Sequence, residues 1–204
     1  MVTARKIKRH LDNIAQVDAD VRQALLQVGY PAPRIRAKGY ETLLSIIVGQ
    51  QISTQAANAI MRRLRDRLPE LTALSILGLS TDQLREAGLS ARKVEYAQGL
   101  ARAISENRFN PEDLTGMDDA QAIAEISALR GLGVWSAQIY LMFSLQREDV
   151  FPRDDLALQV ALQRLRKLSD RPTPKLAEQQ VELWSPWRSA GSLFLWHYYR
   201  GAPT

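Results

Sequence analysis

Apolar residues recur every three or four positions through most of the chain, and this spacing constrains the fold more than any other feature. A clear example is the stripe of Val94, Ala97, Leu100 and Ala101. Such spacing places side chains on one face of a helix, and no stretch shows the sustained alternation typical of a strand. We therefore predict an all-α protein of about ten short helices joined by short loops.

Residues that favour helix starts stand before several predicted helices. Ser53, Ser80 and Ser185 can each accept a hydrogen bond from a backbone N–H of a first turn. Pro186 would then take the first helical position, where proline is tolerated. Residues 28–40, which two prolines interrupt, and residues 146–155 are the candidate linkers.

Composition narrows the classes of function. The net charge of +5 favours a polyanionic partner such as nucleic acid, although many small proteins are mildly basic. The absence of Cys excludes disulfides, thiolate zinc sites and iron–sulfur clusters, and two His cannot form a His-rich metal centre. No apolar run has the roughly 20 residues of a membrane helix, and the charged N-terminus does not resemble a signal peptide. We expect an intracellular, cytoplasmic protein.

Two glycines one residue apart separate two helical segments in "ALRGLGVWSA". Gly131 and Gly133 allow left-handed backbone angles and a close approach to another molecule. The N–H groups that open the following helix form an anion site that suits a DNA phosphate. The alternative is an ordinary helix–helix turn, for which one glycine is enough.

A pair of acidic residues opens a predicted helix after Pro152. Helix capping, which contributes about 1 kcal/mol, explains one aspartate of Asp154 and Asp155 but not both. The second carboxylate is therefore a candidate for chemistry.

The surroundings of both features resemble a known family. The glycines, the aliphatic residue between them and the Ser-Ala pair at Ser136 resemble the helix-hairpin-helix DNA-binding motif, although Arg130 replaces its usual proline. With an aspartate downstream at a helix start, the chain resembles the helix-hairpin-helix DNA glycosylase superfamily. The stretches "LLSIIVGQQIS", "GLSARKVEYAQGLA" and "LWSPWRSAGSLFLW" are similar to its alkylated-base branch, the DNA-3-methyladenine glycosylase II family. The resemblance covers residues 34–199.

The resemblance implies two interleaved helical lobes with a cleft between them. Lobe A would comprise about 1–38 and 151–204, and lobe B about 39–150, with the hairpin at 129–136. Relatives of this branch carry an N-terminal mixed-sheet domain, for which the residues before the matching core are too few, so we expect a compact form. The absence of Cys agrees with a branch that lacks the iron–sulfur cluster.

The resemblance also implies a reaction. Asp155 would be the catalytic carboxylate facing the cleft, while Asp154 caps the helix. The enzyme would flip alkylated purines such as 3-methyladenine out of duplex DNA and hydrolyse the N-glycosidic bond, which starts base excision repair. Trp135 stands where relatives that also cut the backbone carry lysine, so we predict a monofunctional glycosylase.

Further site residues follow from the same resemblance. Trp196 would stack on the flipped base, and Ser189 and Ser192, on the same helical face, would leave room beside the indole. The remaining pocket residues would be Trp135, Ile139 and Leu156, the last two replacing tyrosines of a relative. The DNA-contacting set would be Gln51, Gly131, Gly133, Val134 and Ser136. Gln51 would be the wedge that fills the space left by the base, with Gln50 as the alternative.

No cofactor is expected, apart from a Na⁺ or K⁺ ion on the backbone carbonyls of Leu129 and Leu132. The expected partner is double-stranded DNA with alkylated bases, bound by a monomer away from membranes. Two other classes remain open: a non-catalytic DNA-binding module and a helical scaffold for proteins. Asp155 discriminates against the module, because an acid beside DNA opposes binding unless it has a chemical task.

Overall fold

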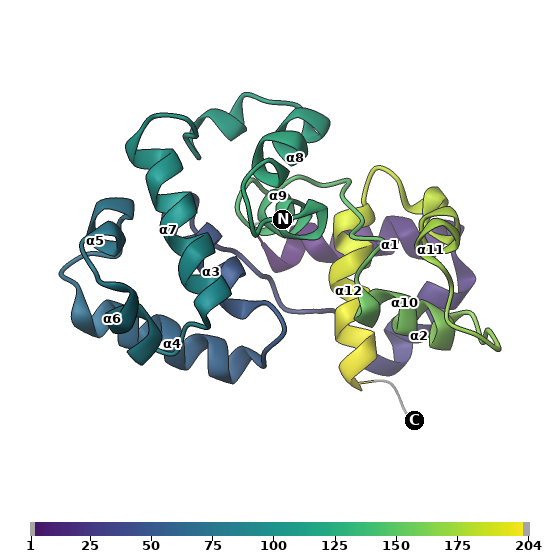
Figure 1. The fold of residues 1–204 in the computed structure, drawn as a ribbon. Coiled ribbons are helices and arrows are strands. Elements are labelled where there is room, and N and C mark those ends of the chain that lie inside the picture. Colours follow the sequence, from purple (N-terminus) through teal and green to yellow (C-terminus); the bar gives the residue numbers. More distant parts are fainter. Residues whose placement is uncertain (1–2, 202–204) are drawn as a thin grey trace. The chain divides into compact units, whose positions relative to one another are not determined.

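The computed structural model describes residues 3–201 (Figure 1). The described residues are 65% helical, and they form twelve α-helices, two short 3₁₀ helices and no strand. The predicted all-α class is therefore confirmed. Ser53 and Ser80 cap the helices that follow them, because their side chains accept from Ala56 N at 3.1 Å and from Gln83 N at 3.2 Å.

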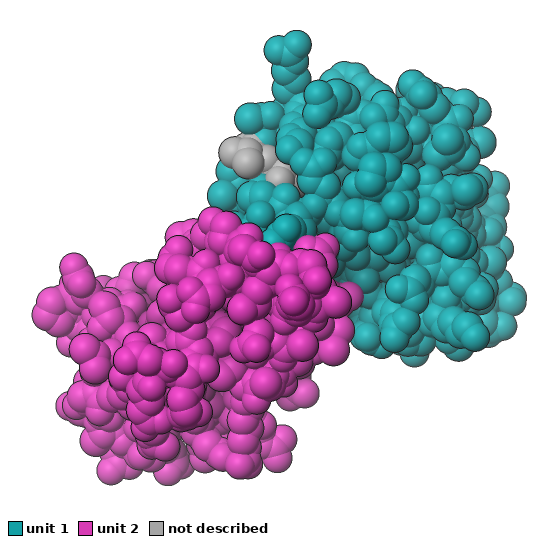
Figure 2. All heavy atoms as spheres, turned by 90° about the horizontal axis from the view of Figure 1, so that it is seen from above, with its two compact units in different colours: residues 1–35, 141–204 teal, residues 36–140 magenta. Residues whose placement is uncertain are grey.

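The chain divides into two compact units (Figure 2). Unit 1 contains both ends of the chain, residues 1–35 and 141–204, and unit 2 contains residues 36–140. The first boundary lies inside the candidate linker 28–40. The second lies after Tyr140, whereas the sequence led us to expect it at 150, because the chain leaves unit 2 within a helix and not within a loop.

Unit 2 is built around α7, which packs against α3 and α5, while α3 also packs against α4. The helices are α3 (Tyr40–Gly49), α4 (Thr54–Arg67), α5 (Ala73–Leu77), α6 (Thr81–Glu86), α7 (Ala91–Ser105), η1 (Asp113–Thr115) and α8 (Asp119–Ser127). α9 (Val134–Phe143) begins in unit 2 and ends in unit 1. The predicted stripe of α7 is buried, and its members Val94, Ala97 and Ala101 form a core cluster with Leu44, Ile76 and Leu84.

Unit 1 brings the first helices of the chain against the last ones, and α12 contacts α1, α2 and α10. Its helices are α1 (Ala4–Val17), α2 (Ala19–Val28), α10 (Leu156–Leu165), α11 (Pro174–Gln180), η2 (Glu182–Trp184) and α12 (Arg188–Gly201). Ile7, Leu11 and Ile14 form the buried face of α1. The predicted face of α10, at Leu158, Leu162 and Leu165, is also buried.

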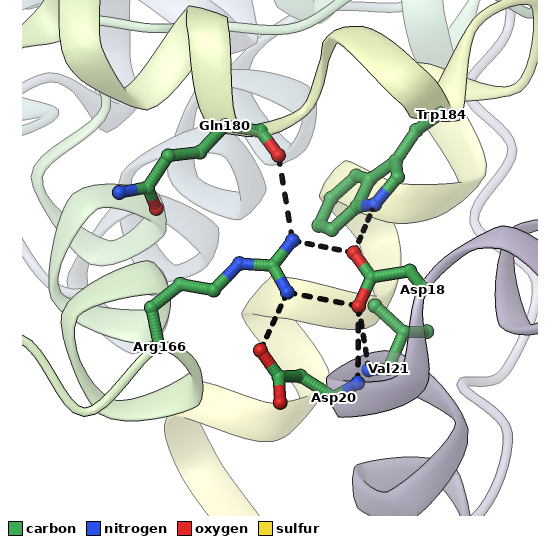
Figure 3. A network of polar contacts seen from close by, with 6 residues as sticks. All are labelled: Asp18, Asp20, Val21, Arg166, Gln180 and Trp184. Carbon is green, nitrogen blue, oxygen red and sulfur yellow. Dashed lines mark hydrogen bonds and ion pairs between the residues drawn. The ribbon is translucent and has the colours of Figure 1, made fainter.

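A partly buried ion pair joins the N-terminal and C-terminal segments of unit 1 (Figure 3). Asp18, the N-cap of α2, accepts from Arg166 Nη1 at 2.8 Å and from Trp184 Nε1 at 2.7 Å. A second guanidinium nitrogen pairs with its other carboxylate oxygen, and Asp20 holds Arg166 Nη1 at 2.7 Å. Burial alone would raise the pKa of Asp18, but the hydrogen bonds and charge of Arg166, with the other donors, lower it.

The start of α12 differs from the prediction. Ser185 does not cap this helix and Pro186 is not its first residue, because α12 begins at Arg188. The Ser185 hydroxyl donates instead to Asp149 Oδ2 at 2.8 Å. Asp149 caps α12 in place of Ser185, because its Oδ1 accepts hydrogen bonds from Arg188 N at 3.2 Å and from Arg188 Nε at 2.8 Å.

Within residues 3–201, no helix is both long and apolar enough to cross a membrane. The same residues contain no group of three or more His, Cys, Asp or Glu side chains that could hold a metal ion.

Candidate functional site

Asp155 is the N-cap residue of α10, at the start of a helix as the sequence indicated. Its Oδ1 accepts two hydrogen bonds, from Leu158 N at 3.0 Å and from Trp196 Nε1 at 3.2 Å. The expectation that Asp154 caps this helix is wrong, because Asp155 does so itself and Asp154 is exposed. Capping and chemistry are compatible in one residue, since a carboxylate has about four lone-pair sites.

Trp196 is half-buried on α12 and reaches Asp155 across unit 1. Its indole lies against Phe143, with the ring centroids 5.8 Å apart and the planes tilted by 37°. The packing orients the indole, and the N–H donation orients the carboxylate. The hydrogen bond from Trp196 to Asp155 was not predicted, because a contact between α12 and the start of α10 has no local signal in the sequence.

Ser189 and Ser192 do not leave room beside the indole, contrary to the prediction. Both are fully buried. The Ser189 hydroxyl accepts from Val150 N at 2.9 Å, and the Ser192 hydroxyl donates to Arg188 O at 2.9 Å. The Ser192 hydroxyl also lies 3.4 Å from Val150 O, so both serines hold the segment before α10 against α12, which helps to place Asp155 next to Trp196.

The other predicted pocket residues differ in exposure. Leu156, directly after Asp155 in unit 1, is 57% exposed. Trp135 and Ile139 lie on the part of α9 that belongs to unit 2, where Trp135 is half-buried and Ile139 is buried. The structure thus brings Asp155, Leu156 and Trp196 together in one unit.

The two glycines of the hairpin turn between α8 and α9 have different surroundings. Gly131 has a φ of +93°, and a Cβ there would lie 2.2 Å from Tyr96 Cγ. Gly133 is exposed, and a Cβ there would have no heavy atom within 4 Å. The fold itself therefore requires a glycine at 131, whereas the glycine at 133 leaves an open backbone surface beside exposed Val134.

The side chain of Gln50 ties the hairpin to the loop after α3. Its Nε2 donates to Gly131 O at 2.8 Å and lies 3.4 Å from Ser136 Oγ. Ser136 is buried, so its hydroxyl faces this contact and not the protein surface. Gln51 is exposed and has a φ of +58°, which is uncommon for a residue other than glycine.

Two contacts of this loop and hairpin were not predicted from the sequence. Tyr96 covers Gly131, and Lys93 Nζ donates to Val48 O at 2.7 Å and to Gln50 O at 2.8 Å. One local feature of the sequence could have indicated the role of Lys93: it lies in the first turn of a helix, where a cation is unfavourable with the helix dipole. No local feature of the sequence indicated the position of Tyr96.

The turn also presents the carbonyls predicted to bind a monovalent cation. Leu129 O accepts from Leu132 N at 3.0 Å, and a carbonyl oxygen has a second lone pair for an ion. The cation at Leu129 and Leu132 stays a prediction.

The sequence matches the family described as "HhH-GPD superfamily base excision DNA repair protein" over residues 44–186. It is 31% identical to "DNA-3-methyladenine glycosylase 1" of Schizosaccharomyces pombe, over 77% of this chain and 71% of that protein. It is 30% identical to "Putative DNA-3-methyladenine glycosylase YfjP" of Bacillus subtilis, over 77% of this chain and 58% of that protein.

The fold is similar to a solved structure, the S. pombe 3-methyladenine DNA glycosylase Mag1 in complex with abasic DNA. The TM-score is 0.87 at 27% identity, and the match covers 95% of this chain and 98% of that one. The matched family segment contains the hairpin, the loop after α3 and Asp155. This chain therefore belongs to the HhH-GPD superfamily of base excision DNA repair proteins.

Proposed function

We propose that this protein is a monofunctional DNA glycosylase that hydrolyses the N-glycosidic bond of alkylated purines in double-stranded DNA. The observation that carries the proposal is the carboxylate of Asp155, held at the start of α10 by Trp196, in a chain similar to 3-methyladenine glycosylases. As the bond to the base breaks, positive charge develops on the sugar. A fixed carboxylate stabilises that charge and orients the attacking water.

The substrate class follows from the leaving group. Bases such as 3-methyladenine are cationic in DNA and leave easily, so one carboxylate is sufficient and no strong general acid is needed. The electron-rich face of Trp196 suits such a base through cation–π attraction. Because Trp135 has no amine, no Schiff base forms at that position, and the product is an abasic site.

Engagement of the duplex is assigned to unit 2. The open backbone at Gly133 and the first turn of α9 receive a DNA phosphate. Gln51 is the wedge, because its side chain is exposed while the amide of Gln50 is already bonded to Gly131 O. The enzyme acts as a monomer on DNA.

Asp155→Asn tests the proposal, with Asp154→Asn as the matched control. Asp155→Asn abolishes the release of 3-methyladenine from methylated duplex DNA, measured by chromatography of the freed bases. Its affinity for the duplex persists or rises, since a negative charge near phosphates is lost. Asp154→Asn, the same change on the exposed neighbour, keeps the activity.

Two outcomes contradict the proposal. Full activity of Asp155→Asn removes this residue from the reaction. A wild-type protein that binds duplex DNA and releases no base from it is a DNA-binding module and not a glycosylase.

A further inference from the structure

The loop between α3 and α4 is held by a contact from α7. Lys93 Nζ donates to Val48 O at 2.7 Å and to Gln50 O at 2.8 Å, so its ammonium group occupies the carboxyl end of α3. The last carbonyls of a helix lack partners within the helix, and a cation is favourable there. Lys93 thus satisfies two carbonyls, those of Val48 and Gln50, in the three residues that precede Gln51.

Lys93 is poorly placed for its own helix. It lies in the first turn of α7, where its charge opposes the dipole of that helix. Burial also lowers the pKa of its ammonium group. Both effects disfavour a charged lysine at this position. The two hydrogen bonds to the carbonyls of Val48 and Gln50 offset them.

The restraint acts on one residue in an uncommon conformation. Gln51, with its φ of +58°, follows Gln50 directly. Gln50 is held at two points, by Lys93 through its carbonyl and by Gly131 through its side-chain amide. A left-handed residue other than glycine persists when the surrounding structure restrains it, and such residues cluster at functional sites.

We propose that Lys93 is a positioning residue for DNA binding: it braces the loop after α3 so that Gln51 enters the duplex in a fixed geometry. The proposal rests on the function given above only in taking Gln51 as the wedge. Lys93 does not contact DNA. Together with Gln50, it links the wedge loop to the hairpin, so that both engage the duplex as one rigid surface.

The test uses Lys93→Met, which keeps most of the apolar stem and removes the ammonium group. Arg92→Met is the matched control, since it removes the same charge from the exposed neighbouring residue. The probe is a duplex with a tetrahydrofuran abasic-site analogue and 2-aminopurine beside it, whose fluorescence reports insertion of a side chain into the stack. This readout needs no base release, so it is independent of whether the protein is a hydrolase.

At saturating protein, we expect Lys93→Met to lower about tenfold the ratio of complexes with Gln51 inserted into the duplex to complexes with Gln51 withdrawn. An effect of this size is expected when hydrogen bonds from a charged group are lost. Arg92→Met keeps the wild-type fluorescence change. In a Gln51→Ala background, Lys93→Met has no further effect, because its influence passes through Gln51. If Lys93→Met does not fold, Lys93→Gln, which keeps one donor, replaces it in the same cycle.

Three results overturn the proposal. The first is a wild-type fluorescence change in a folded Lys93 variant. The second is an equal loss of signal in the presence and absence of Gln51. The third is a weaker affinity with a smaller salt dependence and unchanged insertion, which identifies Lys93 as a phosphate contact.

Discussion

The two glycines of the hairpin turn give opposite predictions for stability and DNA binding. Gly131→Ala places a residue with a side chain at a φ of +93°, which costs about 1–2 kcal/mol. Its Cβ would lie 2.2 Å from Tyr96 Cγ and 2.7 Å from Tyr96 Cβ, so the ring has to move. Overpacking of this kind costs about 1–3 kcal/mol. We expect the free energy of unfolding to fall by about 2–5 kcal/mol.

Gly133→Ala meets neither obstacle, because the added methyl group faces open space. Its free energy of unfolding stays within about 0.5 kcal/mol of wild type or rises slightly. If the backbone at this position touches a DNA phosphate, the methyl group separates the two. The loss of a hydrogen bond to a charged group then weakens DNA binding about tenfold or more at low salt.

The assays are urea unfolding and fluorescence anisotropy with a duplex that contains an abasic-site analogue. Gly99→Ala in α7 is the control, since a Cβ there also meets no atom within 4 Å. It raises stability by up to about 1 kcal/mol as a helix-interior change and leaves DNA binding unchanged. Wild-type affinity of Gly133→Ala refutes the close approach of the hairpin to DNA, and wild-type stability of Gly131→Ala refutes the packing argument.

Three further predictions concern unit 1. Trp196→Phe keeps an aromatic face but loses the N–H donor to Asp155. We expect single-turnover base release to slow about tenfold and the affinity for abasic DNA to stay unchanged. Equal rates of base release in Trp196→Phe and wild type would show that this hydrogen bond has no role in the reaction. Arg166→Met leaves the buried carboxylate of Asp18 without its cation. We expect the free energy of unfolding, measured by urea unfolding, to fall by about 3 kcal/mol. A loss below about 1 kcal/mol would contradict the stabilising role of this ion pair. Burial lowers the pKa of His10 below its usual 6.5, so the unfolded chain binds a proton that the folded chain rejects. Stability therefore decreases as the pH falls below 6.5, and His10→Gln makes that part of the stability–pH curve flatter; parallel curves would contradict the assignment.

The helices were predictable because their signals are local. The apolar stripes of α7 and α10 and the caps at Ser53 and Ser80 depend on residues within one or two turns of each other. The prediction at Ser185 failed because Asp149, distant in sequence, supplies the cap of α12.

The position of Asp155 at a helix start was also readable from the sequence, as was the presence of two glycines between α8 and α9. The sequence could not separate Asp154 from Asp155 as the cap, because either carboxylate can cap until the first residue of the helix is known. Nor could it show that Trp196 donates to Asp155, since that contact depends on how α12 packs against α10.

The all-α class, the buried helix faces, the acidic helix start and the family resemblance can all be read from the sequence, since they depend on periodicity, capping and short motifs. The packing of the helices was needed to show that Tyr96 requires a glycine at 131 while Gly133 is open, and that Lys93 binds the carbonyls at the end of α3. The same packing places Ser189 and Ser192 against the backbone at Val150. Each of these contacts joins residues far apart in the chain, and their distances follow from helix packing, on which no local pattern reports.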